Sequence, residues 1–100
     1  MIRGTTPTHE FKVPFNKDMI KTVKITYCQN DKTIFCKNTE DCTIEDGIIS
    51  VTLTQEDTFA CKLGVFVDIQ VRILTDRDEA LSSNIMHDTV YKSLDDEVLV

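Results

Sequence analysis

Residues 65–74 read V-F-V-D-I-Q-V-R-I-L, a stretch in which two kinds of side chain alternate with a period of two. Successive side chains of a β-strand point to opposite faces, so one face of this predicted strand carries only Val and Ile. The pattern predicts a long strand whose apolar face is covered by a second layer. Its other face has apolar ends and a polar centre, and comprises Phe66, Asp68, Gln70, Arg72 and Leu74.

Two hairpins are predicted on either side of residue 40. Asn30-Asp31 and Asp46-Gly47 occupy the positions of two-residue loops, since Asn, Asp and Gly tolerate positive φ. The first loop pairs Tyr27 with Ile34 and Ile25 with Cys36, which turns Phe35 outward together with Cys28. The second loop pairs Glu45 with Ile48, Ile44 with Ile49 and Cys42 with Val51, which makes Cys42 a core residue.

Short turns separate all the predicted strands. A threonine cap and acidic residues at 54–57 predict a single helical turn between the fifth and sixth strands. The last strand, within residues 80–94, changes its apolar face and needs a bulge near Ser83 and Asn84. Pro14 marks the first strand, 10–15, as an edge. We therefore predict an all-β fold, an antiparallel two-sheet immunoglobulin-like sandwich of about seven strands with one short helical turn.

Composition predicts one domain over residues 1–100, with an extended lead-in at 1–8 and an acidic tail at 95–100. The sequence carries no secretory signal and no apolar run of membrane-spanning length, so we expect a soluble protein and no membrane partner. The net charge is −6: residues 1–37 hold seven basic and three acidic side chains, and the remainder holds four and fourteen. This asymmetry is compatible with head-to-tail contact between copies or with two solvated surfaces. The acidity of the chain as a whole makes nucleic acid a poor partner.

Candidate chemical groups are few and scattered. Cys28, Cys36, Cys42 and Cys61 lack the close pairs typical of zinc sites, and in a reducing compartment we expect free thiols. Any nucleophilic set would have to join a cysteine to His9 or His87, and no local signature marks one. The acidic turn 76–79 lacks the spaced ligands of a calcium loop. We predict no catalytic residues, no metal site and no cofactor.

Several segments together resemble small proteins encoded by tailed phages and prophages of Firmicutes. The resemblance rests on R-G-T-T-P-T-H-E-F-K-V-P-F from Arg3, V-K-I-T-Y-C-Q-N-D from Val23, L-T-Q-E-D-T-F from Leu53, V-D-I-Q-V-R from Val67 and A-L-S-S-N-I-M from Ala80. It implies a virion component associated with the tail, baseplate or tail fibres, with a sandwich similar to baseplate attachment domains. The family offers no catalytic residues to transfer, and the cysteines at 28 and 36 depart from its pattern.

The leading hypothesis is a non-enzymatic phage structural or adaptor protein that forms homo-oligomers and contacts other phage structural proteins. Its expected location is the bacterial host cytoplasm during assembly and then the virion. The mixed face of residues 66–74 is the expected interaction surface. One alternative is a carbohydrate-binding or host-recognition module, for which Phe35, Phe66 and Tyr91 are the candidate outward rings. Another is a small phage-encoded inhibitor of a host protein, since flat interfaces leave no motif.

Overall fold

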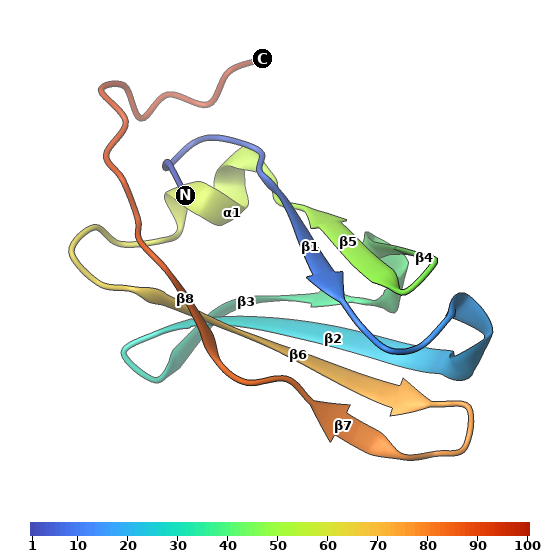
Figure 1. Ribbon diagram of the computed structural model, residues 1–100. Helices are drawn as coiled ribbons and strands as arrows, with labels where there is room; N and C mark the ends of the chain where they lie inside the picture. The colour runs from blue at the N-terminus through green and yellow to red at the C-terminus, as the bar shows by residue number, and fades with distance from the viewer.

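The computed structural model describes residues 1–100 and confirms an all-β sandwich of two antiparallel sheets (Figure 1). One sheet has the strand order β1-β5-β4, and the other has the order β3-β2-β6-β7, with β8 also paired to β6. The strands are β1 (Thr8–Lys12), β2 (Ile20–Gln29), β3 (Lys32–Asn38), β4 (Cys42–Glu45), β5 (Ile48–Thr52), β6 (Val67–Thr75), β7 (Ala80–Ser82) and β8 (Met86–Asp88). The short helices are η1 (Lys17–Met19), η2 (Thr39–Asp41) and α1 (Gln55–Phe59).

The predicted helical turn is α1, which carries the chain from β5 in one sheet to β6 in the other. The Thr54 hydroxyl accepts a hydrogen bond from the Asp57 N–H at 3.1 Å, and the Asp57 carboxylate accepts one from the Thr54 N–H at 2.9 Å. This reciprocal capping box satisfies two N–H groups that a helix start otherwise leaves unpaired. The acidic motif at 54–57 thus fixes where the chain changes sheets.

The core lies between the sheets and is built mainly from β2 and β6. The Val and Ile side chains predicted for one face of β6 are buried, as are their neighbours Val23, Ile25 and Tyr27 in β2. Ile49, Val51 and Leu53 cover them from the smaller sheet. The strand itself begins at Val67, so Val65 and Phe66 lie before it.

The predicted register of the first hairpin is wrong beyond the first pairs. Asn30 and Asp31 do form the loop with positive φ, and Gln29 pairs with Lys32. A β-bulge then shifts the register, so that Tyr27 pairs with Phe35 and Ile25 with Lys37. The bulge absorbs one extra residue, Ile34. Phe35 therefore faces inward and stacks on Tyr27 at 4.5 Å between ring centroids, whereas Cys36 pairs with Thr26 on the outer face.

The other register predictions hold. All three predicted pairs of the β4–β5 hairpin are present, and half-buried Cys42 packs against the core. At the bulge expected near Ser83 and Asn84, the pairing with β6 shifts by one residue and the last predicted strand is interrupted, so that it forms β7 and β8 and gives eight strands instead of seven. There the Ser83 hydroxyl accepts a hydrogen bond from the Val71 N–H at 3.0 Å, in place of a ladder partner. The first strand, however, is shifted to Thr8–Lys12, because its ladder with β5 ends at Gly47 and Pro14 has no N–H to extend it.

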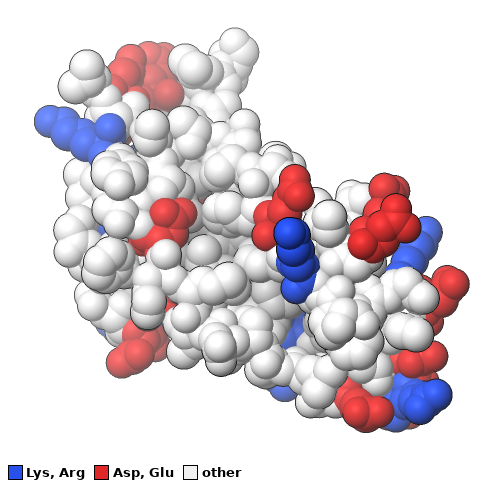
Figure 2. Space-filling model, viewed as in Figure 1, with Lys and Arg blue, Asp and Glu red and all other residues white.

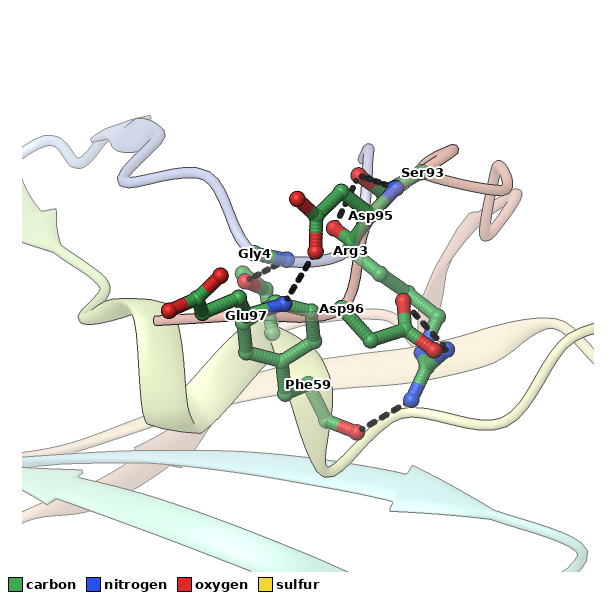
Figure 3. Close-up of polar contacts among 8 residues, drawn as sticks. Arg3, Gly4, Phe59, Ser93, Asp95, Asp96 and Glu97 are labelled. Atoms are coloured by element: carbon green, nitrogen blue, oxygen red, sulfur yellow. Dashed lines mark hydrogen bonds and ion pairs between the residues drawn. The ribbon is translucent and has the colours of Figure 1, made fainter. Parts of the chain in front are cut away.

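The chain ends meet beside α1 (Figures 1 and 3). Arg3 donates to the Phe59 carbonyl at 3.1 Å, pairs with Asp96 at 3.3 Å and lies over the Phe59 ring. The buried Thr58 hydroxyl accepts from the Gly4 N–H and donates to the Thr5 carbonyl, each at 2.9 Å. Residues 3–5 of the lead-in are therefore anchored to α1.

Candidate functional site

The predicted interaction surface lies on the outer face of the five-stranded sheet, which no second layer covers. Asp68, Gln70 and Leu74 are half-buried there and Arg72 is exposed, all along β6 between β2 and β7 or β8. Phe66 precedes the strand and is 60% exposed. The structure therefore places four of these residues in one line along β6 on an open sheet face, and Phe66 just before that strand.

Two cations meet at one end of this face. Arg72 in β6 pairs in register with Lys24 in β2, and both side chains are exposed. Like charges directly opposite one another across two strands are destabilising. Neither residue forms an ion pair within the chain. They border a hollow of about 260 Å³ that Thr22, Leu74 and Ala80 also line.

The other end of the face is acidic and contains a cross-strand row. His87 in β8 and Cys28 in β2 both pair in register with Asp68. The His87 Nδ1 lies 2.6 Å from an Asp68 oxygen, and the His87 ring is 6.0 Å from that of Phe66. Because the carboxylate lies between the thiol and the imidazole, the histidine does not reach Cys28 to act as its base. Cys28 instead contacts the Thr33 hydroxyl at 3.6 Å.

A second, shallow hollow of about 190 Å³ lies at this acidic end. Asp68 and Gln70 line it together with Thr26, Cys28, Asp31 and Ile85. The outer face thus presents two cations at one end and two carboxylates at the other, and Gln70 lies between them. Such a pattern suits the recognition of a surface with complementary charges, because charge pairs fix the register of an interface.

His9 belongs to the interior and not to this face. Its Nδ1 lies 2.8 Å from the Tyr27 hydroxyl, and its ring stacks on that of Tyr27. Burial lowers the pKa of His9, although the negative charge of Asp88 opposes this shift. Burial also raises the pKa of Tyr27, which therefore stays protonated. His9 thus gives the buried Tyr27 hydroxyl a hydrogen-bond partner, without which the unpaired hydroxyl would destabilise the core.

A second internal polar contact joins the five-stranded sheet to α1. Lys37 in β3 lies 2.6 Å from a carboxylate oxygen of Asp57 in α1, and both side chains are about 15% exposed. Burial alone would raise the pKa of Asp57, but hydrogen bonds from Lys37 and the Thr54 N–H hold that pKa below its ordinary value. The sequence prediction missed this pair, because it depends on the bulge that turns Lys37 inward.

The remaining candidate chemical groups are the four cysteines and the acidic turn 76–79. All four cysteines are free, and burial raises the pKa of the Cys42 and Cys61 thiols, which disfavours the reactive thiolate. No group of three or more His, Cys, Asp or Glu side chains converges as a metal site requires. In the acidic turn 76–79, Asp78 pairs with Lys21 at 2.6 Å.

Sequence reasoning missed an apolar groove on the side of the sandwich between β1 and β7. It encloses about 510 Å³, and its apolar lining is Phe11, Val13, Phe15, Val71, Ile73, Leu81 and Met86. The groove exists because the three-stranded sheet does not cover the whole inner face of the five-stranded one. Charged side chains gather toward the end with the β6–β7 turn, and an acidic and a basic side chain lie next to one another near the middle of the view (Figure 2). The sequence signal for this groove was the alternation of apolar residues at Phe11, Val13 and Phe15, which continues beyond the end of β1.

No helix is long and apolar enough to cross a bilayer. The comparisons with known proteins found no matching family model, no similar curated protein and no similar solved structure. The similarity to phage tail proteins therefore stays a prediction from the quoted motifs.

Proposed function

We propose that this protein is a non-enzymatic structural or adaptor component of a phage or prophage particle, associated with the tail, baseplate or tail fibres. It acts through protein–protein contacts, and its docking surface is the outer face of the five-stranded sheet. The phage assignment rests on the sequence resemblance. The docking assignment rests on the geometry of that face.

One observation carries the docking assignment: Lys24 and Arg72 lie opposite one another on an uncovered face without a carboxylate partner. Holding two unpaired cations side by side is unfavourable in the isolated domain. An acidic partner surface removes that penalty on binding. Asp68 at the other end disfavours a partner that is acidic throughout, so the face selects a matched charge pattern.

The carbohydrate-binding alternative loses one of its three expected outward rings. Phe35 stacks on Tyr27 inside the sandwich, while Phe66 and Tyr91 are exposed. Phe66 lies before β6 and Tyr91 follows β8, where it bridges to Ile2. A sugar platform normally needs aromatic rings grouped on one surface. Phe66 and Tyr91 make no contact with one another that would form such a group.

The experiment is mass spectrometry of particles purified after prophage induction in a host that encodes the chain. We expect the protein in a fixed stoichiometric ratio to known tail components, retained through density-gradient purification. A chain that is expressed in the cells but absent from the purified particles would refute the proposal. An array of glycans probed with the same protein tests the host-recognition alternative.

A further inference from the structure

The apolar groove is bordered by two strand edges with unpaired backbone groups. In the β1–β5 ladder, the Val13 N–H donates to the Gly47 carbonyl and the Leu53 N–H donates to the Pro7 carbonyl. Antiparallel pairs alternate between bonded and non-bonded positions, so the odd-numbered residues of β1 face β5. The N–H and C=O groups of Thr8, Glu10 and Lys12 therefore point away from β5 toward the open edge.

The far side of the groove has the same backbone geometry. The Thr75 N–H donates to the Glu79 carbonyl, and the Ser83 N–H donates to the Val71 carbonyl. Ala80 and Ser82 of β7 consequently direct their backbone groups away from β6. β1 and β7 are both edge strands. An apolar groove flanked by free strand edges fits an extended chain better than a compact ligand, because the edges supply main-chain hydrogen bonds.

The chain carries a segment suited to this groove at residues 94–100, L-D-D-E-V-L-V. Leu94 and Leu99 are 97% and 75% exposed, and no residue of the segment belongs to a strand. In an extended conformation Leu94, Val98 and Val100 share one face with Asp96. Such a strand would present a mostly apolar face.

The segment lies beside α1, away from β7, so it does not fill the groove of its own domain (Figure 1). Only backbone bonds between Leu99 and the Gln55 side chain, and the Arg3 contact with Asp96, hold it in place. Lys12, which lines the groove next to Glu10, forms no ion pair within the chain and so offers a partner for the acids of this segment.

We infer that residues 94–100 of one copy add as a strand to the free edge of β1 in a second copy and bury their valines in the groove. Each copy then donates its own residues 94–100 to one neighbour and accepts the same segment from another. This inference goes beyond the proposed function, since it assigns a self-association surface separate from the outer sheet face. Free edges and exposed apolar segments are both features that isolated domains normally avoid.

The test is sedimentation velocity of the full chain over a range of concentrations. The Glu10→Pro variant removes an N–H that faces the open edge and leaves the β1–β5 ladder intact, whereas Glu10→Gln keeps the N–H. We expect concentration-dependent association of the natural chain and of Glu10→Gln, and its loss in Glu10→Pro. The double variant Val98→Asp and Val100→Asp should also be monomeric.

A mixture of Glu10→Pro and the double Asp variant should form a dimer and nothing larger. The Glu10→Pro variant supplies an intact segment 94–100, and the double Asp variant supplies an intact β1 edge. Arg72→Glu should leave association unchanged, which separates this inference from the proposed docking face. A natural chain that stays monomeric, or a Glu10→Pro variant that associates normally, would overturn the inference.

Discussion

Lys37 and Asp57 lie 2.6 Å apart and join β3 of one sheet to the helix that links the two sheets. With η2 between β3 and β4, this contact closes one side of the sandwich. The opposite side, between β1 and β7, has no such closure and opens as the apolar groove. The difference between the two sides determines which surfaces are free for other chains.

Loss of the Lys37–Asp57 pair should destabilise the domain. Asp57→Asn leaves a largely buried ammonium group without its carboxylate, and we expect the free energy of unfolding to fall by about 2 kcal/mol. Urea denaturation measures this change. Asp41→Asn is the matched control, because Asp41 also accepts a backbone N–H, from Asn38, but forms no ion pair. If Asp41→Asn lowered the free energy of unfolding as much as Asp57→Asn, the loss would come from helix capping and not from the ion pair.

The same pair predicts acid sensitivity. The pKa of Asp57 in the folded state lies below its ordinary value of 3.8, so the unfolded chain binds this proton first as the pH falls. The stabilisation is complete above that value and is lost as the pH drops through the folded pKa. The difference in urea midpoint between the natural chain and Asp57→Asn should therefore shrink below about pH 4. A difference in urea midpoint that stays constant down to pH 2 would contradict this prediction.

His9 predicts a second pH dependence at higher pH. Burial holds its pKa below the ordinary value of 6.5, so between the folded pKa and 6.5 the unfolded chain binds more protons. Stability should decline as the pH falls through this window. His9→Gln should remove that slope, and His87→Gln on the exposed face should retain it. Thermal midpoints measured at several pH values between 7 and 5 provide the test.

The sequence predicted most of the fold because its strongest signals are local. The alternation in residues 67–73, the Asp46-Gly47 loop and the Thr54 cap each depend on neighbouring residues. The β2–β3 register could not be predicted, because a bulge at Ile34 reverses the faces of Phe35 and Cys36 without changing the loop. The outer face was located from β6 alone. Its cation pair depends on which strand lies beside β6, and the groove depends on the unequal widths of the sheets.

The bulge can be tested directly by two alanine variants. Phe35→Ala removes a ring stacked on buried Tyr27, and we expect a loss of about 2 to 3 kcal/mol in unfolding free energy. Cys36→Ala changes an outer-face residue and should alter stability by less than about 1 kcal/mol. A register without the bulge predicts the reverse order. Chemical denaturation of both variants distinguishes the two registers.

Gly4 and Gly64 form a matched pair for the anchoring of the lead-in. Both have φ near +80°, so an alanine at either position pays a similar backbone penalty of about 1 kcal/mol. A Cβ at Gly4 would lie 2.5 Å from the Phe59 ring, whereas nothing lies within 4 Å at Gly64. Gly4→Ala should therefore lower the thermal midpoint more than Gly64→Ala. Equal effects would show that residues 3–5 do not pack on α1.

Incorporation of charge-reversed chains into phage particles is the test of docking through the outer sheet face. Lys24→Glu and Arg72→Glu should each fold normally, because both side chains are exposed, and each should reduce the amount of protein in purified particles by about tenfold, equivalent to about 1.4 kcal/mol of binding. Arg77→Glu makes the same charge change in the exposed β6–β7 turn and should be incorporated normally. Quantitative mass spectrometry of the particles gives the comparison. Normal incorporation of Lys24→Glu and Arg72→Glu would contradict docking through the outer sheet face.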